Sequence, residues 1–284
     1  MNSKRLTALA VVLGLATSAP IASAAAGGGD AARIRAALRA EPFFTELFVP
    51  SRAPEGIAIT FHRGAWTGTG AQAAAAEHAD DRAWMHRRWL VVNSSYRPGT
   101  AGLADVRDVY RRVRRATRDA LPICMIGASS GGNLALLAAT RLPDLACLVA
   151  EAAPADLVDI GSQQAYDGSA ESGSSSTGPA YIHDVAIQAL GADNLRPFSP
   201  LYVATRIKAR VLLAEAEQDP LIPAQQLDDL CGRLAARCAG SLRLAPGPLS
   251  FVHAGVSRPA LAQYRRAESR LAHLVAQRFA RSRS

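Results

Sequence analysis

A run of small residues, G-A-S-S-G-G at positions 127–132, carries the clearest chemical signal in the sequence. It follows an apolar, strand-like run and opens a predicted helix, the context in which a G-x-S-x-G turn exposes a serine side chain. We therefore predict that Ser129 is a nucleophile and that the N–H of Ser130 faces a developing oxyanion. The competing interpretation is a structural turn of glycine and serine.

A serine hydroxyl attacks well only when a base removes its proton, and that base needs an acid to orient it. Asp219 ends a predicted strand, and His253 follows the last predicted strand. Both would lie at the sheet edge where ligands bind, the same edge as Ser129. The sequence thus predicts the catalytic triad Ser129, His253 and Asp219. Three other residues compete for these roles: the rival base His183 and the rival acids Glu215 and Glu217.

The oxyanion of an acyl-transfer reaction also needs donors from a second loop. H-R-G-A-W at 62–66 follows a strand-like run at 56–61. Its small residues would let the backbone N–H groups of Gly64 and Ala65 approach a carbonyl oxygen. A plain turn is the other interpretation of this segment.

Short apolar runs alternate with helical patterns along the chain, which predicts an α/β fold whose mostly parallel sheet is covered by helices on both faces. The expected strands are 56–61, 89–93, 122–126, 145–150, 210–214 and 241–245. The expected helices are 30–40, 71–88, 103–118, 130–142, 223–237 and 256–281. A small insert at 157–200 includes a flexible Gly- and Ser-rich stretch, Gly168 to Gly178. Because strands lie on both sides of the insert, we expect a single domain over 25–284.

The N-terminus has the pattern of a secretory signal peptide over residues 1–24. Lys4 and Arg5 precede an apolar stretch at 6–16, and Ala22-Ser23-Ala24 resembles a cleavage site. The apolar stretch is shorter than the roughly 20 residues of a membrane span. We expect a secreted or periplasmic protein without stable membrane insertion after cleavage; an uncleaved anchor is the alternative.

Composition excludes several other classes of function. The chain has 284 residues, 49% of them hydrophobic, and a formal charge of +8 that is spread along amphipathic helices. Without a basic block or an interleaved aromatic platform, we expect no nucleic-acid partner. No cysteine spacing resembles a zinc site, and no metal or organic cofactor is expected.

The four cysteines leave the disulfide pattern open. Cys124 and Cys147 lie in strand-like runs, where a small buried hydrophobic side chain is the default interpretation. Cys231 and Cys238 would be about 10 Å apart on one straight helix. They can pair only if the helix ends before Cys238, which the nearby Gly240 permits.

The motifs G-A-S-S-G-G, H-R-G-A-W, N-S-S-Y-R, S-P-L-Y and D-P-L-I-P…H-A-G together resemble α/β-hydrolase esterases over about residues 55–280. The resemblance includes hormone-sensitive-lipase-like esterases, acetyl esterases and esterase-like relatives of prolyl oligopeptidase. It implies the same triad, an oxyanion hole from the N–H groups of Gly64, Ala65 and Ser130, and a structural role for His62. The chain departs from the family at Arg63, where glycine is usual, and in lacking a glycine shortly before Asp219.

The expected activity is hydrolysis of small carboxylic esters, with short acyl groups preferred, through an acyl-enzyme. A serine peptidase or amidase, or an acyltransferase, would use the same triad. A non-catalytic binding protein could share the fold, but such proteins usually lose a triad member. The sequence does not indicate the oligomeric state or the natural ester.

Overall fold

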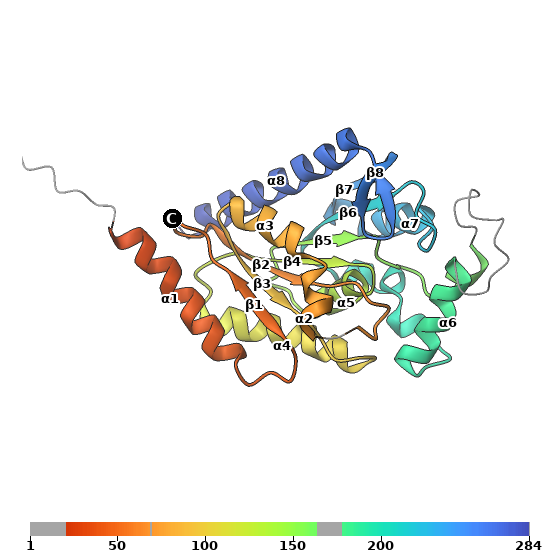
Figure 1. Cartoon of the computed structure of the whole chain (residues 1–284), viewed down its shortest axis with the longest axis horizontal. Coiled ribbons are helices and arrows are strands. Elements are labelled where there is room, and N and C mark those ends of the chain that lie inside the picture. The colour runs from red at the N-terminus through yellow and green to blue at the C-terminus, as the bar shows by residue number, and fades with distance from the viewer. Residues whose placement is uncertain (1–20, 69, 164–177, 284) are drawn as a thin grey trace, which may run out of the picture.

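The computed structural model describes residues 21–68, 70–163 and 178–283, and its centre is a seven-stranded sheet with the order β1-β3-β2-β4-β5-β6-β7 (Figure 1). The strands are β1 (Thr45–Phe48), β2 (Gly56–Phe61), β3 (Trp89–Ser94), β4 (Ile123–Ala128), β5 (Cys147–Glu151), β6 (Arg210–Ala216) and β7 (Cys238–Leu244). Only β1 runs antiparallel to its neighbour. The strands β2 to β5 are buried along their whole length, as Val-, Ile- and Ala-rich parallel strands covered on both faces should be.

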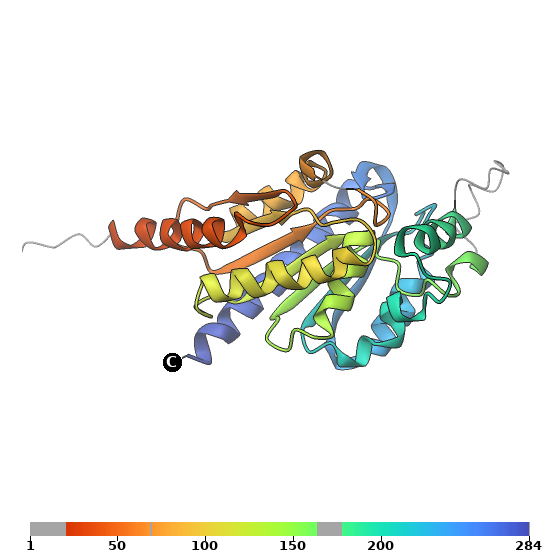
Figure 2. The same ribbon diagram turned by 90° about the horizontal axis from the view of Figure 1, so that it is seen from below.

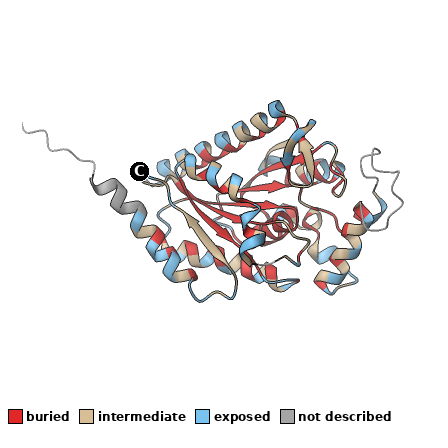
Figure 3. Ribbon diagram, in the orientation of Figure 1, coloured by how far each residue is buried: buried red, intermediate tan, exposed pale blue. Residues whose placement is uncertain are grey.

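Helices cover both faces of the sheet and divide the core into two parts. One face packs against α1 (Ile21–Leu38), α4 (Ala101–Ala116), α5 (Ser130–Ala139) and α7 (Gln225–Leu234), which lie in front in Figure 2. The other face packs against α3 (His78–His86) and α8 (Arg258–Arg281). Successive side chains along a strand point to opposite faces of the sheet, which produces this division. On β4, for example, Met125 belongs to the first core cluster and Ile126 to the second. Figure 3 shows the buried sheet between half-exposed helices.

The predicted α/β architecture is confirmed, and most elements lie close to where the sequence placed them. The predicted helix over 71–88 is two helices, α2 (Gly70–Ala75) and α3. The sequence missed β1 and a separate two-stranded hairpin, β8 (Pro246–Phe251) and β9 (Ala254–Val256). These are short, half-exposed segments whose pattern carries little strand signal.

The insert at 157–200 joins two neighbouring strands, β5 and β6, of the same sheet. Its described part contains short 3₁₀ turns and α6 (Pro179–Leu190). The flexible stretch predicted at 168–178 lies outside the described residues except for Gly178. Residues 1–20 also lie outside them, and α1 begins at Ile21, within the predicted signal peptide. Among the described helices, none is both long and apolar enough to cross a membrane.

All four cysteines are paired. Cys124 and Cys147 lie directly opposite each other on β4 and β5, with their Cα atoms 4.5 Å apart, and form a disulfide rather than two free buried thiols. Local apolar character could not reveal this register. Helix α7 ends at Leu234, so Cys238 turns back and forms the second disulfide with Cys231 across a Cα separation of 5.4 Å.

Candidate active site

Ser129 lies at the sharp turn between β4 and α5. Its backbone is in an unfavourable conformation (φ 51°, ψ −122°), and the side chain is almost enclosed, with 6% exposure. Position 127 requires glycine, because a Cβ on Gly127 would lie 2.5 Å from the carbonyl oxygen of Gly131. The Ser129 N–H donates to the carbonyl of Glu151 on β5 at 2.8 Å, which ties the turn to the sheet. The predicted strand–turn–helix context of Ser129 is therefore present.

The structure joins the predicted base to the predicted acid. Nδ1 of His253, at the tip of the β8–β9 hairpin, lies 2.9 Å from Oδ2 of Asp219, which follows β6. The other carboxylate oxygen of Asp219 accepts hydrogen bonds from the N–H groups of Leu221 (2.8 Å) and Ile222 (2.9 Å). Burial alone would raise the pKa of Asp219, but its hydrogen bond with His253 and the charge of His253 bring the pKa below its usual value.

An ionised Asp219 can only accept hydrogen bonds, so Nδ1 of His253 carries the proton in this pair. In the neutral ring, Nε2 is then free to accept a proton. Within the described part of the chain, no hydrogen bond joins Ser129 Oγ to His253. Contacts of this kind commonly tighten only when substrate binds.

The two competing acids do not contact His253 among the described residues. Glu217 is exposed, whereas Glu215 is buried on β6 beside Asp219. Burial raises the pKa of Glu215 well above its usual range, and the negative charge of Asp219 adds to this. This shift favours the protonated form of Glu215, which can donate a hydrogen bond to Asp219. The rival base His183 lies on α6, 3.4 Å from Asp184.

The segment predicted as an oxyanion loop makes a tight turn after β2. Gly64, Ala65 and Trp66 all have positive φ angles, of 142°, 52° and 61°. Gly64 must be glycine, because a Cβ there would be strained and only 3.2 Å from the Cα of Gly68. The turn is closed by hydrogen bonds from the N–H groups of Thr67 (2.9 Å) and Gly68 (3.0 Å) to the Gly64 carbonyl.

His62 is fully buried and anchors this loop rather than facing a substrate. Its Nδ1 lies 2.6 Å from the Arg63 carbonyl, and its Nε2 lies 3.0 Å from Ser95 Oγ. Burial lowers the pKa of His62, so the ring is neutral, with Nδ1 donating and Nε2 accepting. Both ring nitrogens are engaged, as the structural role implied by the resemblance requires.

The remaining motifs hold the oxyanion loop and the nucleophile turn together. The Tyr96 hydroxyl lies 2.9 Å from the His62 carbonyl, to which it donates, and 3.0 Å from Ser130 Oγ. Trp66 Nε1 donates to Asn133 on α5 at 3.2 Å. Ser130 is the first residue of α5, so its N–H has no acceptor within the helix and is free to face an oxyanion.

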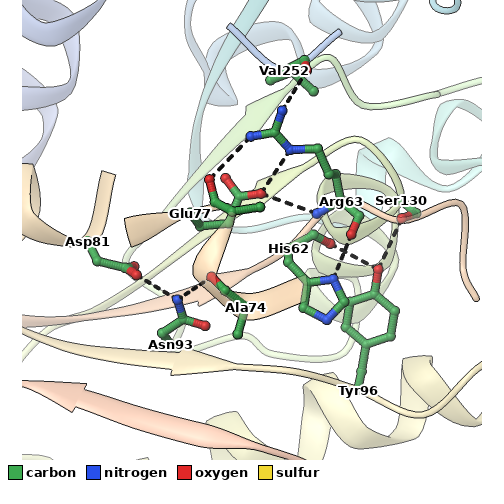
Figure 4. A network of polar contacts seen from close by, with 10 residues as sticks. His62, Arg63, Ala74, Glu77, Asp81, Asn93, Tyr96, Ser130 and Val252 are labelled. Carbon is green, nitrogen blue, oxygen red and sulfur yellow. Dashed lines mark hydrogen bonds and ion pairs between the residues drawn. The ribbon is translucent and has the colours of Figure 1, made fainter. Parts of the chain in front are cut away.

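Arg63, the departure from the family pattern, makes contacts that the sequence did not reveal (Figure 4). Its Nε lies 3.2 Å from Glu77 Oε1, and its Nη1 lies 2.5 Å from the carbonyl oxygen of Val252, the residue before His253. Its Nη2 lies 3.3 Å from the carbonyl oxygen of Ala76. Glu77 lies within the helix predicted over 71–88, and no local signal in the sequence marks its burial.

Three acidic residues near the site form a cluster. Glu77, Asp80 and Glu151 have carboxylate oxygens within 4.8 Å of one another. Arg63 pairs with Glu77, Arg265 pairs with Asp80, and Tyr264 donates to Glu151. Each of these carboxyl groups thus contacts a neighbouring polar or basic side chain through one of its oxygens.

No family model matches the chain, and a search of curated proteins finds no match. Solved structures do resemble it. A Thermogutta terrifontis esterase phosphonylated by sarin is 14% identical, with a TM-score of 0.60 over 79% of this chain and 86% of that one. A hormone-sensitive lipase from a metagenome library is 16% identical, with a TM-score of 0.59 over 88% and 91%. A puromycin-hydrolysing peptidase of Mycobacterium tuberculosis is 20% identical, with a TM-score of 0.58 over 83% of this chain and 37% of that one. At these identities the likeness establishes the architecture: the chain has the α/β-hydrolase fold.

Proposed function

We propose that this protein is a serine hydrolase that cleaves carboxylic esters through an acyl-enzyme on Ser129. The observation that carries the proposal is the hydrogen bond between His253 and a buried, ionised Asp219, at the sheet edge where the turn between β4 and α5 carries Ser129. The fold shared with esterases supports this proposal.

Each step follows from the chemistry of these groups. His253 Nε2 removes the proton from Ser129 Oγ as that oxygen attacks the ester carbonyl, and Asp219 stabilises the imidazolium that forms. The developing oxyanion accepts hydrogen bonds from the N–H groups of Ser130, Gly64 and Ala65. His253 then donates its proton to the leaving alcohol, and water hydrolyses the acyl-enzyme by the reverse sequence of proton transfers.

The test is hydrolysis of p-nitrophenyl acetate by the wild type and by Ser129→Ala, together with labelling by a fluorophosphonate. We expect Ser129→Ala to lower turnover by about 10⁴-fold or more. Intact-protein mass should show one phosphonyl adduct on the wild type and none on Ser129→Ala or His253→Ala. An adduct that persists on Ser129→Ala would refute the assignment of the nucleophile.

A peptidase or amidase is the second candidate, because the fold is also shared with a puromycin-hydrolysing peptidase. Both activities require the same triad, and they differ in the leaving group that must be protonated. Comparing kcat/KM for p-nitrophenyl acetate and for an aminoacyl p-nitroanilide separates them; an anilide preference would favour the peptidase.

We infer a preference for short acyl groups from the insert after β5. Its large apolar side chains, such as Leu157, Ile160, Ile182 and Leu190, are buried in the core and do not form an open apolar surface. Val158, with 40% exposure, is the only exposed large hydrophobic residue in the described part of the insert. A lipase lid needs a continuous apolar face toward its substrate. In a series of p-nitrophenyl esters we expect kcat/KM to be highest from acetyl to butyryl and to decline by octanoyl; a maximum at ten or more carbons would contradict this inference.

A further inference from the structure

Arg63 connects two loops that are far apart in the sequence and that both belong to the site. Its backbone lies in the oxyanion loop, between His62 and Gly64, while its guanidinium reaches the hairpin that carries His253. Glu77, the residue before α3, accepts hydrogen bonds from the backbone N–H (3.3 Å) and from Nε of Arg63. These two bonds fix the guanidinium. The Glu77 side chain is only 5% exposed, which makes it a well-ordered anchor.

The hairpin needs such a contact because it is not part of the main sheet. In the part of the chain that the structure describes, β8 and β9 pair only with each other, and an isolated two-stranded hairpin is marginally stable in water. Phe251, the last residue of β8 before the tip, packs edge-on against Tyr264 of α8 with ring centroids 5.4 Å apart. At the tip, Val252 has a φ angle of 48°, which is strained for a β-branched residue. The two residues of the tip itself, Val252 and His253, are therefore held by the Phe251 contact on one side and by polar contacts of their own.

Two polar contacts of Val252 and His253 oppose this strain. One is the hydrogen bond from His253 to Asp219. The other is the hydrogen bond from Arg63 Nη1 to the Val252 carbonyl at 2.5 Å, which fixes the peptide group that leads into His253. A charge-assisted hydrogen bond of this kind is stronger than a neutral one and is directional.

We propose that Arg63 is a positioning residue: it holds the peptide between Val252 and His253 so that the imidazole is aligned with Ser129. This inference rests on the proposed serine hydrolase function. Because Arg63 contacts neither Ser129 nor the ring of His253 among the described residues, it acts through the backbone of the hairpin. The Lys side chain cannot replace it fully, since one ammonium cannot occupy the Nε and Nη1 positions of a planar guanidinium at once.

Arg63→Ala should lower kcat for p-nitrophenyl acetate by about 10²-fold, the cost of a misplacement near 1 Å, with KM within about threefold of the wild type. The rate of fluorophosphonate labelling should fall in parallel, and Arg63→Lys should recover part of both. Added guanidinium should also raise the rate of Arg63→Ala.

The matched control is Arg87→Ala. Arg87 also binds a buried carboxylate, Glu268 at 3.1 Å, and a backbone carbonyl, that of Arg265 at 3.2 Å, but among the described residues it makes no hydrogen bond to a loop of the site. This variant should keep the kcat of the wild type, even though its thermal unfolding temperature falls. Equal loss of kcat in both variants would show that Arg63 contributes only to stability.

A double-mutant cycle with His253→Ala decides whether Arg63 acts through the histidine. If it does, adding Arg63→Ala to His253→Ala should leave the residual rate within about twofold, since effects of residues that act as a unit are not additive. A further 10²-fold loss in that background, or no loss in the wild-type background, would overturn the proposal. If Arg63→Ala does not fold, Arg63→Lys takes its place in both backgrounds. Wild-type protein that neither hydrolyses the ester nor takes up the label would instead refute the proposed function.

Discussion

Replacing Asp219 by asparagine is the most direct test of how the site uses its acid. In the wild type, Oδ1 accepts from the N–H groups of Leu221 and Ile222, and Oδ2 accepts from His253. The asparagine carbonyl oxygen must stay with the two N–H donors, because the opposite orientation would place an NH₂ group against them. The amide NH₂ of Asp219→Asn therefore faces His253.

This orientation forces the wrong tautomer on the base. A donor opposite Nδ1 requires Nδ1 to accept, so the proton of the neutral ring moves to Nε2, the atom that must receive the Ser129 proton. We expect kcat/KM to fall by about 10⁴-fold, which corresponds to about 5 kcal/mol of transition-state stabilisation. Folding should be less affected, because the hydrogen bonds to Leu221 and Ile222 remain.

The assay is p-nitrophenyl acetate hydrolysis at constant pH, with Glu217→Gln as the matched control for loss of one carboxylate nearby. Glu217 is exposed on the same loop, and its replacement should change kcat/KM by less than about twofold. If Asp219→Asn stayed within tenfold of the wild type, or if Glu217→Gln were the crippling change, the assignment of Asp219 as the orienting acid would be wrong.

Three further predictions concern stability and processing. Burial raises the pKa of Asp81 to about 7, so the folded state keeps a proton that the unfolded chain loses. The protonated Asp81 therefore contributes fully to stability below about pH 4, and up to about 4 kcal/mol of the free energy of unfolding is lost as the pH rises to 7. Urea unfolding at several pH values should show this decrease in the wild type and a smaller decrease in Asp81→Asn. Alanine at both Cys231 and Cys238 should lower the free energy of unfolding of the oxidised protein by about 2 kcal/mol, and an unchanged urea midpoint would argue against that disulfide. We also expect export to remove residues 1–24, and N-terminal sequencing of the exported protein should begin near Ala25; a chain that still starts at Met1 would refute this.

The sequence alone determined much of the sheet and the position of the turn that carries Ser129. Strands β2 to β6 were predictable because buried parallel strands are continuous apolar runs, and each is bounded by residues that break the pattern. The turn around Ser129 was predictable because its glycines allow a close approach between backbone atoms that are only a few residues apart. Asp219 was expected at the same sheet edge as Ser129 because it follows a parallel strand, as it does in the structure, whereas His253 reaches it from a hairpin outside the main sheet.

Tertiary structure decided the contacts between segments distant in the chain. The edge strand β1 and the β8–β9 hairpin are short and half-exposed, so their pairing depends on neighbours rather than on their own pattern. The pairing of Cys124 with Cys147 depends on the register of two strands, which one residue of slip would abolish. The bridge from Arg63 to the Val252 carbonyl spans 189 positions and ends on a backbone atom. No residue type at position 252 encodes that acceptor, because every peptide group carries a carbonyl and only the folded chain decides which one Arg63 meets.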